Sequence, residues 1–206
     1  MISDTWAVVP IKALDQAKSR LAPVMGPVER RALVLKMLRH TLSVLCRCDD
    51  LQGILVIGTD PAVRRAALAQ EAVFLTESAA GGLNGSLAEA AAHLLTREAQ
   101  GLLVIPGDLP HLRLSSIQEL VRLGVPRGVV IAPDRRELGT NALLVTPPDL
   151  IPFCFGPNSF RQHLAAAEAA GVTPIVVRSP DLAMDVDLPE DLSLVSEYQS
   201  FCFPPD

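Results

Sequence analysis

Short apolar runs alternate with longer segments of helical periodicity from Thr5 to Ala132, and this alternation restricts the chain to few architectures. The runs are apolar at consecutive positions, so strands formed from them would be buried on both faces, as in a mostly parallel sheet with helices on each side. The predicted strands are Thr5–Pro10, Leu51–Thr59, Ala72–Leu75, Gly101–Pro106 and Gly128–Ala132. The sequence therefore predicts an α/β fold, with Gly101–Pro106 as its central strand.

Helical patterns fill the intervals between these runs. The predicted helices of this half are Val28–Arg47, a helix that begins at Pro61, Leu83–Ala99 and Ser115–Leu123. Asp60 and Ser115 have the short polar side chains that cap helix N-termini, and Pro61 suits a first helical position.

After Pro133 the pattern is less regular, and a partly antiparallel second half is expected. The predicted elements there are strand Asn141–Val145, helix Phe160–Ala170, strand Val172–Val177 and a closing helix Pro189–Tyr198. No repeat, low-complexity segment or linker interrupts the chain, which favours one domain over residues 1–206.

The composition of the chain excludes several classes of protein. Of its 206 residues, 49% are hydrophobic and only 4% aromatic, which indicates an aliphatic core. The net charge of −5 argues against nucleic acid as a binding partner. No apolar run reaches the roughly 18–20 residues of a membrane span, and the N-terminus does not resemble a signal peptide. A cytoplasmic protein without a membrane partner is expected.

The four cysteines, Cys46, Cys48, Cys154 and Cys202, are too few and too scattered for a disulfide framework. Cys46 and Cys48 also lack the two-residue spacing of a zinc site, so all four are interpreted as buried or incidental thiols. The apolar segment Phe201–Pro205 could dock on its own chain or on a partner, and a homodimer is one possibility.

In α/β sheets of this kind, ligands bind outside the carboxyl ends of the strands. Three chemically unusual segments are expected there: the loop after Pro10, the loop after Pro106, and the segment around Asp185. The first carries Lys12, Lys18 and Arg20 within nine residues, and these cations suit phosphate oxygens. The alternative is a basic loop that is merely solvated.

The other two segments carry three carboxylates, Asp108, Asp185 and Asp187. If Asp185 and Asp187 end a strand, they point the same way, and something positive is expected between them. Carboxylates with substrate phosphates form the environment that Mg²⁺ prefers. The alternatives are that Asp108 or Asp187 caps a helix.

Three further segments combine glycine with small polar residues: 80–86, 133–142 and 155–161. In the first, the glycines would let the backbone approach a flat ligand, and Asn84, Ser86 or backbone amides could contact a base edge. The last ends at a helix N-terminus, where anions bind readily. His40 and His163 lie in helical patterns and are interpreted as surface histidines.

Together these segments resemble the guanylyltransferases of coenzyme F420 biosynthesis, the 2-phospho-L-lactate guanylyltransferases and their phosphoenolpyruvate-using relatives. The resemblance extends from Pro10 to Leu192, and its most specific part is the run from Pro10 to Leu21, which ends in Ala-Lys-Ser-Arg-Leu. Shorter matches follow in the expected order: Asp-Leu-Pro at 108–110, Gly-Thr-Asn-Ala-Leu at 139–143, Phe-Gly-x-x-Ser-Phe at 155–160 and Asp-Val-Asp-x-Pro-Glu-Asp-Leu at 185–192.

The resemblance implies a Rossmann-like α/β/α sandwich of the nucleotidyltransferase type that nucleotide-sugar pyrophosphorylases share. It implies that GMP passes from GTP to the phosphate of phosphoenolpyruvate or 2-phospho-L-lactate and that pyrophosphate is released. The residues it implies are Lys12, Lys18, Arg20 and Asp108 for catalysis, Gly82, Leu83 and Asn84 for guanine, Thr140, Gly156 and Ser159 for the acceptor, and Asp108, Asp185 and Asp187 for one or two Mg²⁺ ions.

The chain departs from the family pattern at three places. Glu137-Leu138 stands where Gly-Thr is more usual, Asn158 replaces a glycine, and Leu188 replaces a threonine. Two alternative functions remain open at this stage. One is a nucleotidyltransferase that acts on molybdopterin or a sugar phosphate, and the other is a nucleotide-binding protein without catalytic activity.

Overall fold

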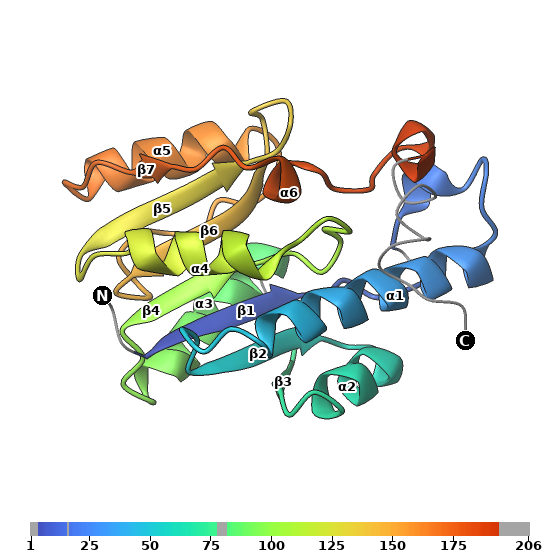
Figure 1. Ribbon diagram of the computed structural model, residues 1–206, viewed down its shortest axis with the longest axis horizontal. Coiled ribbons are helices and arrows are strands. Elements are labelled where there is room, and N and C mark those ends of the chain that lie inside the picture. The colour runs from blue at the N-terminus through green and yellow to red at the C-terminus, as the bar shows by residue number, and fades with distance from the viewer. Residues whose placement is uncertain (1–3, 16, 78–81, 194–206) are drawn as a thin grey trace.

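The computed structural model describes residues 4–15, 17–77 and 82–193 of the chain. Its centre is one seven-stranded sheet with the strand order β3-β2-β1-β4-β6-β5-β7 (Figure 1). The strands are β1 (Thr5–Pro10), β2 (Gly53–Gly58), β3 (Val73–Thr76), β4 (Gly101–Val104), β5 (Gly128–Pro133), β6 (Thr140–Thr146) and β7 (Ile175–Val176).

The first four strands are parallel to one another, and β6 runs antiparallel to both of its neighbours, β4 and β5. The predicted α/β class and mostly parallel mixed sheet are therefore confirmed. β4 lies in the middle of the strand order and is buried throughout, as expected of the central strand.

Helices cover both faces of the sheet because successive strand residues alternate between two apolar clusters. Ala7 and Val9 of β1 belong to one cluster, and Val8 between them belongs to the other. The first cluster packs under α1 (Pro27–Leu45), α2 (Pro61–Leu68), α4 (Leu114–Leu123) and α6 (Pro180–Ala183), and the second under α3 (Gly82–Leu95) and α5 (Ser159–Ala169). Figure 1 shows α1 and α4 in front of the sheet and α3 behind it.

The start of α2 forms as the sequence predicts. The Asp60 carboxylate accepts a hydrogen bond of 2.7 Å from the amide of Ala62, and Pro61 is the first residue of the helix. Arg31 of α1 also donates to Asp60 through two nitrogens, at 2.6 and 3.0 Å, which fixes α2 against α1.

The prediction that Ser115 caps α4 is wrong. The helix begins one residue earlier, at Leu114, with Arg113 at the capping position and no side-chain cap. The predicted helix Leu83–Ala99 is shorter than expected and ends at Leu95. The residues that follow Leu95 still favour a helix, but the chain must turn there to enter β4.

The C-terminal part differs most from expectation. The strand predicted at Val172–Val177 is reduced to Ile175–Val176, and a short helix, Pro180–Ala183, follows it. Asp185 and Asp187 therefore follow a helix rather than end a strand. A 3-10 helix occupies Pro189–Asp191; the rest of the helix predicted up to Tyr198, together with the apolar tail and Cys202, lies outside the described residues.

No helix in the described ranges is long and apolar enough to cross a membrane.

Candidate active site

The three segments predicted at the carboxyl edge of the sheet meet around one side chain, Lys18. Its Nζ lies 2.5 Å from Oδ2 of Asp108 and 2.8 Å from Oδ1 of Asp187. Lys18 comes from the loop after β1, Asp108 from the loop after β4, and Asp187 from the segment after α6. Residues separated by up to 169 positions thus form one charged cluster.

This cluster lies where the chain changes direction across the sheet. After β1 the chain proceeds outward to β2 and β3, and it returns on the other side of β1 to form β4. The loops that leave β1 and β4 lie at this change of direction, which is the usual ligand-binding place in such sheets.

The charges of the cluster stabilise one another. Burial of Lys18, whose side chain is 7% exposed, disfavours the ammonium, but the attraction of Asp108 and Asp187 outweighs it and raises the pKa of Lys18. Burial also opposes ionisation of Asp187, but Lys18 and then Arg20, whose guanidinium lies 3.4 Å away, lower its pKa below the usual value.

Asp185 has the opposite electrostatic environment. Burial raises the pKa of Asp185 to about 6, and the negative charges of Asp108 and Asp187 add to this effect. The carboxylate therefore lies among like charges that the single ammonium of Lys18 does not neutralise. A further cation at this place would stabilise its ionised form.

Gly107 lies where the loop after β4 packs against the loop after β1. A Cβ atom built on Gly107 would lie 2.2 Å from Cδ1 of Ile11, far inside any van der Waals contact. A larger residue at this position would force the end of the Ile11 side chain to move, so glycine allows the loop after β4 to pack on the loop after β1 in this arrangement. Asp108 is thereby placed beside the loop that carries Lys18.

The cluster borders a cavity of about 650 Å³, within the usual size range of small-molecule sites. All three predicted cations line this cavity, and so do Asp108 and Asp187. Gly82, Leu83 and Thr140 of the predicted base and acceptor sites line it as well. The structure thus brings most of the predicted site residues to one cavity.

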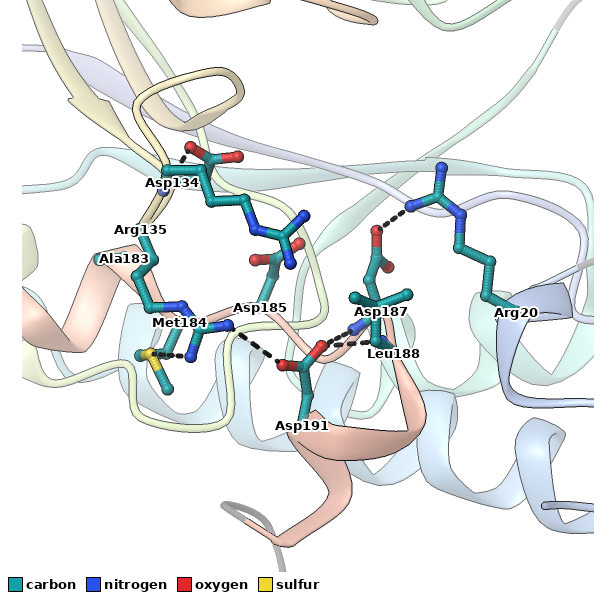
Figure 2. Close-up of a pocket in the computed structure, with 10 residues that line it drawn as sticks. Arg20, Asp134, Arg135, Ala183, Met184, Asp185, Asp187, Leu188 and Asp191 are labelled. Carbon is teal, nitrogen blue, oxygen red and sulfur yellow. Dashed lines mark hydrogen bonds and ion pairs between the residues drawn. The ribbon is translucent and has the colours of Figure 1, made fainter. Parts of the chain in front are cut away.

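Asp185 faces a second, smaller cavity of about 100 Å³, on whose wall Asp187 and Arg20 also lie. Figure 2 shows Arg20 and Arg135 on opposite sides of the pair Asp185 and Asp187. Arg135 extends toward Asp191, with 3.5 Å between the charged groups.

The Asp191 side chain also stabilises the turn that carries the aspartates. Its Oδ2 accepts from the amides of Asp187, at 3.0 Å, and Leu188, at 2.7 Å (Figure 2). The capping role considered for Asp187 thus belongs to Asp191, while the carboxylate of Asp187 pairs with Lys18 and Arg20.

The carboxylates of Asp108, Asp185 and Asp187 are chemically suited to a hard cation such as Mg²⁺. In the described part of the chain, however, no three acidic, histidine or cysteine side chains are gathered closely enough to hold a metal ion. Lys18 binds two of the three carboxylates at once, so metal coordination by all three requires this ammonium to move.

The N-terminal end of α3 borders the cavity with both backbone and side chains. Gly82 has a φ of +58°, a backbone conformation that glycine adopts without strain. The Ser86 hydroxyl lies 3.1 Å from Oε1 of Glu77, and both residues line the cavity. A carboxylate, held by a buried hydroxyl, thus stands at this end of the cavity.

Asn84, predicted for the guanine site, makes a different contact. Its Nδ2 donates to the carbonyl of Phe155, at 3.0 Å, and its Oδ1 accepts from the amide of Phe155, at 2.8 Å. It is not among the residues that line the large cavity. Asn84 instead connects α3 to the loop before α5.

The predicted acceptor residues lie around the start of α5. Thr140 and Phe155 line the cavity, whereas Gly156, which is exposed, and Ser159, which is buried, do not. Gly156 has a φ of +138° and Asn158 a φ of +57°. Asn158 therefore adopts the left-handed conformation expected of the residue that replaces a glycine.

The interpretation of His163 as a surface histidine is wrong. Its side chain is fully buried, with one ring nitrogen 3.0 Å from the Thr140 hydroxyl and the other 2.9 Å from the Cys154 amide. Helical spacing alone does not show whether a histidine faces solvent or the sheet.

Glu77 is a candidate site residue that the sequence motifs did not identify. It directly follows a strand at the binding edge of the sheet, and the same kind of position identified Asp108.

His40, also interpreted as a surface residue, is half-buried and contacts the carbonyl of Leu112.

Solved structures similar to this one are nucleotidyltransferases. A protein of Desulfovibrio desulfuricans G20, described as a nucleotide-diphospho-sugar transferase, superposes with a TM-score of 0.77 over 98% of this chain and 90% of its own, at 14% identity. The 4-diphosphocytidyl-2C-methyl-D-erythritol synthase of Anaerococcus prevotii gives 0.66 over 96% of each chain, at 10% identity. These likenesses show the nucleotidyltransferase type of fold.

Curated relatives share more of the sequence. The phosphoenolpyruvate guanylyltransferases of Rubrobacter xylanophilus and Sphaerobacter thermophilus are 43% and 39% identical to it, over 91% of this chain and 91% and 90% of their own lengths. A 3-phospho-D-glycerate guanylyltransferase of Colwellia psychrerythraea is 33% identical over 93% of this chain and 91% of its own.

The family described as "Guanylyl transferase CofC like" matches residues 5–196, which include the loops that carry Lys18, Asp108 and Asp187. The resemblance noted from the motifs is thus confirmed over almost the whole chain. With its nucleotidyltransferase fold and its charged cluster at the edge of the sheet, the protein is an enzyme of the CofC-like guanylyl transferase family.

Proposed function

We propose that this protein transfers GMP from GTP to the phosphate of a small phospho-acid and releases pyrophosphate, as a step in the biosynthesis of coenzyme F420. The observation that carries this proposal is the cluster of Lys18, Asp108 and Asp187 beside a cavity of about 650 Å³. Both substrates are strongly anionic; Lys12, Lys18 and Arg20 supply positive charge around this cavity, and the two aspartates would hold a cation there.

Lys12, Lys18 and Arg20 would hold the triphosphate and stabilise the departing pyrophosphate. All three line the cavity, and Lys18 already lies next to the two aspartates at its edge. Lysine supplies a compact charge and arginine a planar fork, and both bind phosphate oxygens well. Asp108 would maintain the position of Lys18 and thereby contribute to catalysis.

Asp108, Asp185 and Asp187 would hold one or two Mg²⁺ ions, since their carboxylates match the preference of this cation for oxygen ligands. When bound, Mg²⁺ would neutralise charge between the α-phosphate and the acceptor phosphate. The raised pKa of Asp185, with like charges on two sides, supports a cation at this position.

Gly82 and Leu83 would contact the guanine base, and Glu77 and Ser86 would recognise its edge. Guanine presents two N–H donors on that edge, and a carboxylate such as Glu77 accepts both. Adenine presents a ring nitrogen acceptor there instead, which a carboxylate repels. Asn84 would contribute indirectly, by its two hydrogen bonds to the backbone of Phe155.

Thr140, Gly156 and Ser159 would bind the carboxylate and phosphate of the acceptor. Phosphoenolpyruvate is the acceptor we favour, because relatives named for it are 43% and 39% identical, against 33% for the relative named for 3-phospho-D-glycerate. The acceptor phosphate is already ionised and nucleophilic, so the transfer needs no covalent enzyme intermediate.

The experiment is to measure pyrophosphate release from GTP and Mg²⁺ with phosphoenolpyruvate, 2-phospho-L-lactate or 3-phosphoglycerate in parallel. We expect pyrophosphate release to require a phospho-acid and to be fastest with phosphoenolpyruvate. A sugar phosphate and molybdopterin are tested alongside, and release only with one of these two would replace the proposed acceptor class. Tight GTP binding without release from any acceptor would favour a non-catalytic nucleotide-binding protein.

A further inference from the structure

His163 has a hydrogen-bonding partner at each ring nitrogen, although it lies on the buried face of α5. The amide nitrogen of Cys154 lies 2.9 Å from Nε2, and the hydroxyl of Thr140 lies 3.0 Å from Nδ1. The Phe155 ring packs edge-on against the imidazole, with 4.8 Å between ring centroids. The imidazole is thus fixed in orientation on three sides.

These contacts determine which ring nitrogen carries the proton. A backbone amide can only donate, so Nε2 of His163 accepts from Cys154 and is unprotonated. The ring proton is therefore on Nδ1 and is donated to Thr140. Burial lowers the pKa of His163 to about 4, which agrees with a neutral ring at physiological pH.

The tautomer in turn determines what the Thr140 hydroxyl can do. Because the hydroxyl oxygen accepts from His163, its own proton is left to be donated elsewhere. Thr140 is 7% exposed and lines the cavity that Lys18 and Asp108 also line. A ligand oxygen that contacts this hydroxyl from the cavity would therefore meet a donor, which favours an anionic oxygen.

The second contact of His163 acts on the adjacent loop. By accepting from Cys154, the imidazole fixes the backbone that leads into Phe155 and Gly156. Asn84 holds the same loop from the opposite side, through the backbone of Phe155. One buried ring thus positions both the hydroxyl of Thr140 and the loop that precedes α5.

We propose that His163 is a positioning residue for the acceptor: it holds the Thr140 hydroxyl as a hydrogen-bond donor to a carboxylate or phosphate oxygen of the phospho-acid. This inference rests on the proposed function, because it assumes that the acceptor occupies the cavity beside Thr140. It adds a residue that would not touch the substrate but would determine its affinity.

Two variants separate the two contacts of the ring. His163→Gln offers an acceptor near the position of Nε2 and removes the donor to Thr140. His163→Asn offers a donor near the position of Nδ1 and removes the acceptor for Cys154. We expect His163→Gln to raise the KM for the phospho-acid about tenfold or more, with the KM for GTP within twofold of wild type.

His163→Asn is expected to keep the KM for the phospho-acid closer to that of the wild type than His163→Gln does. His40→Gln is the matched control, because it makes the same chemical change at a histidine that contacts the carbonyl of Leu112 rather than Thr140. It is expected to leave both KM values within twofold of wild type.

A double-mutant cycle with Thr140→Val tests whether His163 acts through Thr140. Without the hydroxyl, His163→Gln is expected to cause little further increase in the KM for the phospho-acid. Equal effects of His163→Gln in the presence and absence of the hydroxyl would overturn the inference. So would an unchanged KM in His163→Gln accompanied by a lower Tm, since that result indicates a purely structural histidine.

The wild-type protein supplies a test that needs no variant. Nitrogen NMR of the imidazoles at pH 7 shows which nitrogen of each ring is protonated, and comparison with His163→Asn assigns His163. A proton on Nδ1 alone is expected, and a proton on Nε2 would overturn the inference. Wild-type turnover, measured with the kinetics of the variants, tests the proposed function separately. If no phospho-acid supports turnover, the proposed function is wrong, whichever nitrogen of His163 carries the proton.

Discussion

At the scale of single residues, the central feature of this protein is a lysine ammonium held between two carboxylates. Lys18 has a positive φ of +53°, an uncommon conformation for a residue with a side chain. This backbone conformation is compatible with the two short contacts to Asp108 and Asp187. The ammonium offsets part of the negative charge of these two carboxylates.

We expect Lys18→Met to affect metal and nucleotide binding in opposite directions. Removal of the ammonium leaves Asp108 and Asp187 free to bind a cation, so the affinity for Mn²⁺ alone should rise by about tenfold. The affinity for GTP should fall by about the same factor, because a phosphate contact is lost. Calorimetric titration with Mn²⁺ and, separately, with GTP measures both.

Weaker binding of Mn²⁺ by Lys18→Met would show that the ammonium does not compete with a metal. Lys36→Met is a suitable control, since Lys36 is on α1 and does not line either cavity.

Asp108→Asn should lower the rate of guanylyl transfer at least a hundredfold while the protein remains folded. The substitution keeps the shape of the side chain but removes the charge that holds Lys18, and about 2.7 kcal/mol of transition-state stabilisation corresponds to such a loss. Steady-state turnover at saturating Mg²⁺ measures it, with Asp49→Asn at an exposed position as control. Turnover within threefold of wild type would exclude Asp108 from the active site.

At the scale of elements, the loop between β5 and β6 explains one departure from the family pattern. Glu137 stands at a φ of +53°, where the family more often has glycine. Its carboxylate lies 2.7 Å from Nε of Arg178, which lowers the pKa of Glu137. An ion pair thus accompanies the strain of a side chain in this conformation.

Glu137→Gly should therefore leave the urea midpoint of unfolding close to that of the wild type. Both side chains of the ion pair are exposed, so its contribution is small, and glycine removes the backbone strain. Urea unfolding measures the change, with Arg178→Gln as the comparison that removes the ion pair and keeps the strain. A clear fall of the midpoint in Glu137→Gly, with none in Arg178→Gln, would contradict this account.

Local patterns predict the elements of the first half well because each strand is a continuous apolar run. β1 begins and ends where the sequence predicts, and Asp60 caps α2 as expected. The segment after β7 was predicted poorly because short helices such as Pro180–Ala183 depend on packing rather than on periodicity.

The same distinction applies to the candidate site. Its charged residues could be identified because cations and carboxylates follow strand ends at an edge that the fold class identifies. The contact between Lys18 and both aspartates could not be predicted, because it joins residues 90 and 169 positions apart. The burial of His163 depends on which face of α5 meets the sheet.

At the scale of the whole molecule, the burial of titratable side chains determines how the free energy of unfolding depends on pH. The pKa of His163 is about 4 in the folded protein, against about 6.5 in an unfolded chain. Between these values the unfolded state binds a proton that the folded state does not. The stability associated with a neutral His163 is therefore complete above about pH 6.5 and is lost as the pH falls toward 4.

The stability difference between the wild type and His163→Gln should therefore shrink on acidification. From pH 7 to pH 5 it should decrease by on the order of 2 kcal/mol, because only the wild type has this histidine to protonate on unfolding. Urea unfolding of both proteins at the two pH values measures it, and the other titrating groups cancel in the comparison. A difference that is the same at both pH values would contradict the burial of a neutral imidazole.

The sheet order places the loops of β1 and β4 side by side, and this arrangement allows one lysine to join residues from three parts of the chain. The proposed reaction follows from this arrangement, and the fate of the phosphates of GTP tests it most directly. The measurement is the transfer of radioactive phosphorus from GTP to phosphoenolpyruvate, with the label at the α-position in one reaction and at the γ-position in the other. Label from the α-position should enter the acceptor product, and label from the γ-position should leave as pyrophosphate. Entry of the γ-label into the product, or no entry of either label while GTP still binds, would contradict guanylyl transfer to this acceptor.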